Sequence, residues 1–196
     1  MFNNSFNFLN VVTKATKKAA IIAIAVAAIN VSAYAQSSFV KGDNVVGVSV
    51  GFGGYYSGNY YRDVSRIPYI ALYYENCVKD NLFDEKSAIG IGAMLGHTSA
   101  TWSNYYRTST TNIGIRGSLH YAFVEKLDVY TGLMLGYNIV SWKWLDNTYS
   151  GSGDATSRAF GSWFLGARYY FNDKVAVFSE LGYGSANFNV GLALKF

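Results

Sequence analysis

The stretch that decides the fold spans residues 186–196 and reads ANFNVGLALKF. Its large apolar side chains occupy every second position: Phe188, Val190, Leu192, Leu194 and Phe196. A period of two is typical of a β-strand with one apolar face and one small or polar face. Because an unpaired apolar strand edge aggregates in water, a strand of this kind favours a closed barrel in a membrane.

The beginning of the chain has the pattern of a secretory signal. An apolar run over residues 19–31 follows three lysines, Lys14, Lys17 and Lys18. The run is followed by Ala33-Tyr34-Ala35, so the sequence predicts a cleavable signal peptide with cleavage after Ala35. The alternative is an uncleaved anchor helix, but the run is shorter than the ~20 residues that a spanning helix needs.

Removal of the predicted signal peptide, residues 1–35, changes the charge of the chain. The whole sequence carries a formal charge of +4, and the signal holds three of its lysines and no acidic residue. The remaining domain, residues 36–196, has 13 basic and 12 acidic residues, so we expect no nucleic-acid partner. Its one cysteine, Cys77, forms no internal disulfide and is expected to be a small buried residue.

The alternating pattern recurs along the domain and predicts an all-β fold, an eight-stranded antiparallel up-and-down transmembrane β-barrel. The predicted strands are 44–53, 69–78, 88–98, 111–123, 128–140, 159–171, 175–184 and 186–196. Short turns are expected around 79–87, 124–127 and 172–174, and long loops around 54–68, 99–110 and 141–158. In outer-membrane barrels the short turns are periplasmic and the long loops face outside.

Aromatic residues are predicted to form two rings on the apolar outer faces of these strands. The ring near the short turns contains Tyr74, Tyr121, Phe123, Tyr169, Phe171 and Phe196. The ring near the long loops contains Phe52, Tyr137, Trp163, Tyr183 and Phe188. Two aromatic girdles around an aliphatic band indicate a barrel that crosses two lipid–water interfaces. They argue against the alternative, a soluble lipocalin-like barrel with its large residues inside.

The opposite faces hold glycine, small residues and most of the charges that lie on strands. Facing inward avoids a cost of ~2–4 kcal/mol for each Arg or Lys near the membrane midplane. We expect an interior polar network of Glu75, Arg116, His120, Arg168, Glu180 and Lys195. Within it we expect Arg168 to pair with Glu180, its diagonal neighbour on the next strand. The network is interpreted as a charge-balanced plug or as a polar path for small solutes.

With these features the whole domain resembles the small eight-stranded outer-membrane barrels of the OmpA/OmpX type. The resemblance rests on Ala33-Tyr34-Ala35, on the eight alternating strands, and on residues 166–171, 180–184 and 189–196. It implies residence in the outer membrane of a Gram-negative bacterium and contact with lipopolysaccharide. It also implies periplasmic chaperones and insertion by the barrel-assembly machinery, which reads an aromatic-ended strand such as the one ending in Phe196.

Ser118 and His120 are candidates for nucleophilic chemistry, because they lie two residues apart on one face and lipid A deacylases of similar size use a His/Ser/acid set. A triad also needs an acid that orients the histidine, and the sequence places none clearly, so we expect no enzyme activity. Residues 51–54 lack the spacing of a phosphate loop. The two histidines are too separate in sequence to suggest a metal site, and we expect no metal and no cofactor.

The long loops are rich in aromatic residues among Asn, Ser, Gly and Arg, a composition that suits recognition. The candidates are Tyr55, Tyr56, Tyr60, Tyr61, Trp102, Tyr105, Tyr106, Trp142, Trp144 and Tyr149. The alternative interpretation is that strands protrude beyond the membrane and these rings pack on them or on lipid headgroups.

The sequence therefore predicts a monomeric outer-membrane barrel with a structural or surface-interaction role carried by its outer loops. The alternative is a narrow channel, or a porin-like passage for small solutes or small hydrophobic molecules. An ionic plug across the interior would favour the surface role, and an unblocked interior path would favour the channel.

Overall fold

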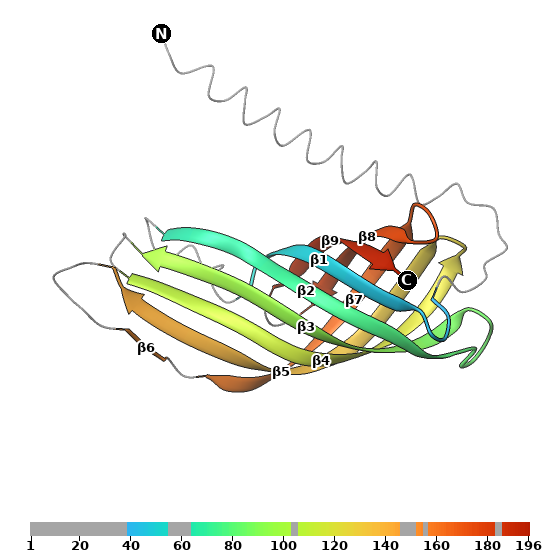
Figure 1. The fold of residues 1–196 in the computed structure, drawn as a ribbon, viewed down its shortest axis with the longest axis horizontal. Coiled ribbons are helices and arrows are strands. Elements are labelled where there is room, and N and C mark those ends of the chain that lie inside the picture. Colours follow the sequence, from blue (N-terminus) through green and yellow to red (C-terminus); the bar gives the residue numbers. More distant parts are fainter. Residues whose placement is uncertain (1–38, 55–63, 103–105, 146–151, 155–156, 183–185) are drawn as a thin grey trace, which may run out of the picture. The chain divides into compact units, whose positions relative to one another are not determined.

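The computed structural model describes residues 39–54, 64–102, 106–145, 152–154, 157–182 and 186–196. Within this part, eight antiparallel strands close a barrel (Figure 1). They are β1 (Asn44–Phe52), β2 (Val64–Asp80), β3 (Ser87–Trp102), β4 (Tyr106–Val124), β5 (Leu127–Trp144), β7 (Arg158–Tyr170), β8 (Val175–Gly182) and β9 (Phe188–Lys195). A short ninth strand, β6 (Ser152–Asp154), pairs with β5. The predicted fold class is confirmed, whereas the predicted signal peptide lies outside the described residues.

Each barrel strand pairs with the next along the chain, and β9 returns to pair with β1. The pairing of β9 explains why its apolar edge is not exposed: β1 covers one side and β8 the other. The seam is completed by two backbone hydrogen bonds of 2.9 Å between Asn44 and Phe196. Among the described residues, no helix is both long enough and apolar enough to cross a membrane.

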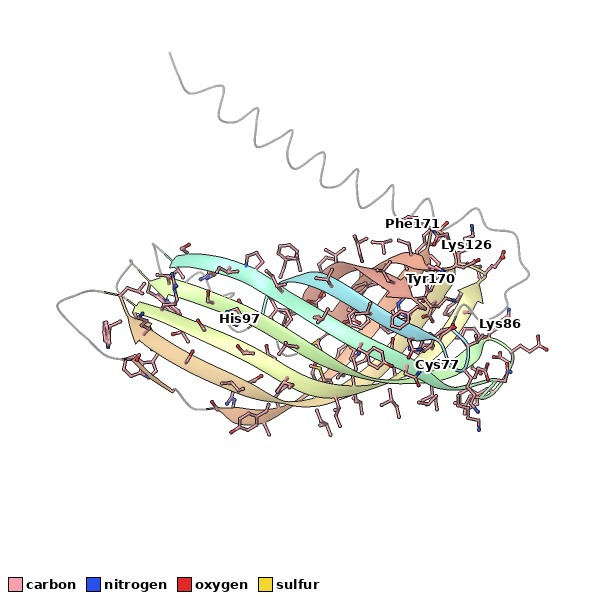
Figure 2. The ribbon with its side chains drawn as sticks, viewed as in Figure 1. Cys77, Lys86, His97, Lys126, Tyr170 and Phe171 are labelled. Carbon is pink, nitrogen blue, oxygen red and sulfur yellow. The ribbon has the colours of Figure 1, made fainter. Side chains whose placement is uncertain are left out.

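The two ends of the barrel differ in their connections. The end that carries the short connections 81–86, 125–126 and 171–174 is called the turn end, and the other the loop end. Figure 2 shows Lys86, Lys126 and Phe171 gathered at the turn end, with His97 toward the loop end. Asn44 and Phe196 also lie at the turn end, because they pair with each other beside the start of β1.

The large apolar side chains face outward, as the alternation predicts. The most exposed aliphatic residues of the wall include Leu72, Ile91, Ile115, Leu133, Leu135, Leu181 and Leu192. Described members of the two predicted aromatic rings are also exposed on this surface: Phe52, Tyr74, Tyr121, Phe123, Tyr137, Trp163, Phe171, Phe188 and Phe196. A barrel with this outer surface would aggregate in water, whereas lipid solvates it.

Glycines make room for the aromatic side chains that fill the interior. A Cβ added at Gly47 would overlap the ring of Tyr73, and one added at Gly166 would overlap the ring of Tyr130. Each ring therefore lies flat over a glycine of the paired strand, which allows large side chains into a narrow barrel.

The barrel wall has uneven height, which differs from the sequence prediction. Strands β2 to β5 continue past the loop ends of β1, β8 and β9 (Figure 1). Residues 99–102, 106–110 and 141–144 were predicted as loops but belong to β3, β4 and β5. The first two segments are rich in Ser and Thr and lack the apolar alternation of a lipid-facing strand. Pro68 lies inside β2 at a register shift, where a missing N–H is tolerated.

Candidate functional site

The centre of the lumen holds a buried network of six ionisable side chains. They come from five strands: Glu75 from β2, Arg116 and His120 from β4, Asp128 from β5, Arg168 from β7 and Glu180 from β8. All six are buried, and Arg168 and Glu75 are fully so. They face inward because alternate residues of each strand share a face.

Arg168 connects opposite sides of this network. Its Nη2 donates to Oε2 of Glu75 over 2.8 Å, and its Nη1 lies 3.6 Å from Oδ2 of Asp128. The predicted partnership of Arg168 with Glu180 is wrong, because Asp128 sits directly opposite Arg168 in the β5–β7 register and competes for the guanidinium. Glu180 instead accepts from Nη2 of Arg116 over 2.6 Å and from the hydroxyl of Tyr130 over 2.9 Å.

His120 has a carboxylate on each ring nitrogen. Its Nδ1 lies 2.8 Å from Oδ2 of Asp128, and its Nε2 lies 3.2 Å from Oε1 of Glu75 and 2.9 Å from Oγ of Ser118. The statement that no acid orients this histidine is therefore wrong, since Asp128 does so. Asp128 is the first residue of the predicted strand 128–140, and it lies two residues from the inward-facing Tyr130, on the same side of β5.

The resulting Ser–His–Asp arrangement has a second carboxylate on the serine. Ser118 donates its hydroxyl to Oε1 of Glu75, while its Oγ also lies 2.9 Å from Nε2 of His120. A nucleophilic serine needs its proton accepted by the histidine. The three carboxylates face two arginines and both ring nitrogens of His120, so the six side chains form a closed buried network.

Lys195 lies apart from the network in which it was predicted. Its Nζ is 3.4 Å from Oδ2 of Asp43 at the turn end, where both side chains are about one-fifth exposed. Lys195 is the last residue of β9, opposite Val45 of β1, so its side chain reaches the barrel opening.

Aromatic rings fill the space between the charged groups. The guanidinium of Arg116 lies 4.0 Å from the ring centre of Phe164, and that of Arg168 lies 5.0 Å from the ring centre of Tyr130. Tyr73 and Phe178 meet edge to face at 5.0 Å. Cation–π contacts of this kind stabilise desolvated cations, so the middle of the lumen is filled and charge-paired.

Phe39 is a lumen residue that the sequence analysis missed. It precedes β1 and has no exposed surface, and its ring centre lies 4.5 Å from that of His120. No strand pattern surrounds it, and it follows directly after the predicted signal region, so no periodic signal could have placed it inside.

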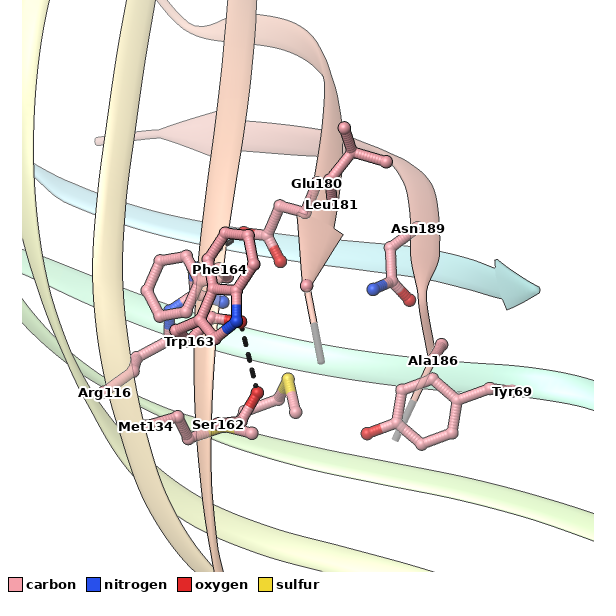
Figure 3. A pocket seen from close by; sticks show the side chains of 12 residues that line it. Tyr69, Arg116, Met134, Ser162, Trp163, Phe164, Glu180, Leu181, Ala186 and Asn189 are labelled. Atoms are coloured by element: carbon pink, nitrogen blue, oxygen red, sulfur yellow. Dashed lines mark hydrogen bonds and ion pairs between the residues drawn. The ribbon is translucent and has the colours of Figure 1, made fainter. Parts of the chain in front are cut away.

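A small cavity of about 30 Å³ lies on the loop-end side of the Arg116–Glu180 pair (Figure 3). Its lining includes Met94, Met134, Phe164, Ala186 and Asn189. Nε of Arg116 and Oδ1 of Asn189 are buried without a hydrogen-bond partner, and both residues line this space. A cavity of this size has room for one or two water molecules, which such atoms need as partners.

Aromatic residues gather at the loop end, in strands rather than in loops. Trp102 ends β3 and Tyr106 begins β4, while Trp142 and Trp144 lie near the end of β5. The ring of Tyr106 lies 5.8 Å from Trp102, 6.2 Å from Trp142 and 5.3 Å from Trp144. The other recognition candidates lie outside the described residues: Tyr55, Tyr56, Tyr60, Tyr61, Tyr105 and Tyr149.

This aromatic cluster lies on the face that continues from the lumen. Trp102, Tyr106 and Trp144 form one row of the register, and Trp142 is two residues from Trp144. Tyr106 and Arg116 are an even number of residues apart in β4, so they lie on the same face of the strand, and Arg116 faces the lumen. The cluster therefore overhangs the barrel opening, as the alternative interpretation of protruding strands predicts.

The other face of the same extension carries basic residues. Arg107 and Lys143 are directly opposite each other in the β4–β5 register, and both are exposed. Nε of Arg107 donates to Oγ1 of Thr101 over 3.1 Å, which orients the guanidinium. Like charges at directly opposed positions destabilise a sheet, so an anionic partner would relieve this pair. Within the described residues, no group of three or more metal-binding side chains could hold a metal ion.

Comparison with known proteins supports the architecture alone. No family model and no curated protein matches the chain. The structure is similar to Ail, the attachment invasion locus protein of Yersinia pestis, solved in complex with the heparin analogue sucrose octasulfate, with 10% identity and a TM-score of 0.52. This match covers 80% of the chain and 100% of Ail.

A second similar structure is the N-terminal β-barrel domain of Pseudomonas aeruginosa OprF. It has 10% identity and a TM-score of 0.50, over 80% of this chain and 98% of that domain. Together with the closed eight-stranded barrel, these matches show that the chain has the fold of the small outer-membrane β-barrels.

Proposed function

We propose that this protein is an integral outer-membrane barrel with a plugged lumen, and that it binds anionic glycans at its loop end. The observation that carries the proposal is the distribution of charged and aromatic side chains along the barrel axis. The middle of the lumen is occupied by the paired network around Arg168 and Glu75, while the exposed basic and aromatic residues collect where β3, β4 and β5 protrude.

The orientation follows from the connections. Short turns are periplasmic in outer-membrane barrels, so the turn end would face the periplasm and the protruding strands would face outside. Lys143 lies four residues beyond the lipid-facing Ile139, or about 13 Å along a strand at ~3.3 Å per residue. That distance reaches the level of phosphates and sugars above the hydrocarbon layer.

The ligand class follows from charge and surface chemistry. The described part of the extension presents Arg66, Arg107 and Lys143 as exposed basic residues, and Arg158 is exposed at the start of β7. Sulfated and phosphorylated sugars, lipopolysaccharide among them, carry the complementary charge. Ail, which has the same fold, was solved with a sulfated sugar, and this supports testing one here.

Biogenesis is proposed on the same basis. We assign residues 1–35 to a cleaved signal peptide and residues 36–196 to the barrel. Periplasmic chaperones and the barrel-assembly machinery would deliver a monomeric barrel, with the outward side chains of β9 as the assembly signal: Phe188, Val190, Leu192, Leu194 and Phe196.

The refolded barrel is expected to be electrically silent in a planar bilayer. Arg168 bonds to Glu75 across the lumen and aromatic rings pack against its guanidinium, so passage of an ion would require this buried network to rearrange. Single-channel recording checks this, with heat-modifiable gel mobility to verify that the barrel is folded. Reproducible discrete openings that change with Arg116 or Arg168 substitution would instead support the channel alternative.

Replacing both Arg107 and Lys143 by alanine is expected to weaken binding of sucrose octasulfate by about tenfold or more, because two exposed cations that face one anion are lost. Titration of the folded protein at low ionic strength measures the dissociation constant. The matched control is the Lys126→Ala, Lys174→Ala variant, which removes the same charge from exposed turns at the other end. Equal weakening by both double variants would show that net charge alone attracts the ligand.

A further inference from the structure

Residues 39–43, called here the N-terminal cap, fold back under the turn end of the barrel before β1 begins. The cap is a compact turn: the backbone N–H of Asp43 donates to the carbonyl of Val40 over 2.9 Å, and the N–H of Val40 donates to Oδ2 of Asp43 over 3.0 Å. Gly42 has a φ of 96°, in the left-handed region that favours glycine. The sequence therefore builds a local turn that points Phe39 at the lumen.

Phe39 seals the ion network from this side. Its ring packs at 4.5 Å against His120 and lies 5.8 Å from the guanidinium of Arg168. It belongs to a buried apolar layer shared by strands on both sides of the seam: Val45, Tyr73, Cys77, Ala88, Tyr170, Ala176, Phe178 and Ala193. Without the ring, the lumen beside His120 and its carboxylate partners would be open at the turn end.

The cap is held to the barrel wall by contacts that lie outside the strand ladder. The ladder between β1 and β2 begins at Asn44, so no ladder hydrogen bond of the wall depends on the cap. Its tethers include Gly42 N–H to the Cys77 carbonyl at 3.0 Å, Cys77 N–H to the Asp43 carbonyl at 2.9 Å, Asn76 Nδ2 to the Asp43 carbonyl at 3.3 Å, Lys41 N–H to Asp80 at 3.1 Å, and the Asp43–Lys195 ion pair. The last two lie at the surface, where such contacts add little stability.

We propose that residues 39–43 are a hinged cap that closes the turn end of the lumen, and that the cap opens without unfolding of the barrel. Segments held by few contacts open locally, at a lower free energy than global unfolding. The closed cap excludes water from the network around His120, which strengthens its hydrogen bonds. The open cap admits solvent to that network from the side of the short turns.

Cys77 provides a natural reporter of this motion. It is the only cysteine in the chain, its side chain is 1% exposed, and its Sγ lies 3.9 Å from the Phe39 carbonyl. A thiol reagent can therefore reach Cys77 when the cap is away. The rate of labelling by a maleimide then measures the fraction of molecules with an open cap.

The experiment labels Cys77 in the folded, detergent-solubilised protein. Wild type is expected to react far more slowly than urea-unfolded protein, and Phe39→Ala at least about tenfold faster than wild type, because the ring that holds the cap is lost. Phe39→Leu keeps an apolar anchor and is expected to restore slow labelling. Phe83→Ala is the matched control, since that phenylalanine lies 78% exposed in a turn at the same end.

Gel mobility and a urea midpoint establish that each variant retains a closed barrel during labelling. If Phe39→Ala fails to fold, Asp43→Ala replaces it: this change removes the ion pair with Lys195 and is expected to accelerate labelling by a few-fold. The proposal is overturned if both variants label at the wild-type rate. It is also overturned if Phe83→Ala accelerates labelling as much as Phe39→Ala, or if wild type reacts as fast as unfolded protein.

Discussion

Replacing Arg168 by methionine is expected to lower the free energy of unfolding by about 3–5 kcal/mol, the cost of leaving buried charges without their partner. Arg168 has no exposed surface and bonds to Glu75, with Asp128 at 3.6 Å. Methionine keeps much of the packing volume, so the loss reports the charge. Urea titration of the barrel in lipid vesicles, followed by tryptophan fluorescence, measures the change.

Lys195→Met is the control for this measurement, because the partly exposed pair of Lys195 with Asp43 is expected to contribute less than about 1 kcal/mol. Adding Glu75→Gln to Arg168→Met is expected to recover part of the loss, since one orphaned charge is then removed. Similar small losses for Arg168→Met and Lys195→Met would mean that the network is hydrated rather than sealed.

The second large effect is expected on the outer surface. Leu135→Arg places a cation where the side chain is 65% exposed in the middle of the apolar band, and it is expected to destabilise the barrel by about 2–4 kcal/mol in a bilayer. The cause is the transfer of a guanidinium from water into lipid. The same vesicle titration measures it.

Ser141→Arg is the matched control, because Ser141 lies on the same strand and the same face but beyond Ile139, the last large apolar residue of that row. A substitution above the hydrocarbon layer is expected to cost about 0–1 kcal/mol. If Leu135→Arg were as well tolerated as Ser141→Arg, the apolar band would not face lipid. This pair of variants tests the membrane position independently of any ligand.

The strands inside the membrane could be predicted from the sequence, and those outside it could not. Where a strand crosses the membrane, its side chains point alternately to the lipid and to the lumen. The sequence of such a strand therefore has a period of two, as in residues 186–196. Beyond the apolar band, β3 and β4 carry Ser and Thr on both faces. The sequence around Thr108 and Ser109 therefore gives no sign that these residues pair with β3, as they do in the structure.

The composition of the ion network could be predicted, but its pairing could not. The alternation of inward and outward side chains assigns five residues to the interior, and all five lie there: Glu75, Arg116, His120, Arg168 and Glu180. The alternation does not determine in which direction a long side chain extends inside the barrel. Arg168 contacts Glu75, 93 residues away in sequence, rather than its diagonal neighbour Glu180. Phe39 could not be predicted for a related reason: the buried apolar layer that surrounds its ring exists only when the strands are assembled.

The sequence separation of the network has a consequence for biogenesis. Glu75 meets Arg168 across 93 residues, and Arg116 meets Glu180 across 64. While β7 and β8 are missing, a growing sheet of β1 to β5 holds Glu75 without Arg168 and Arg116 without Glu180, at a cost of several kcal/mol for each ion that leaves water. Such a half-built sheet would be disfavoured in lipid, so we expect insertion, closure of the barrel and charge neutralisation to be cooperative.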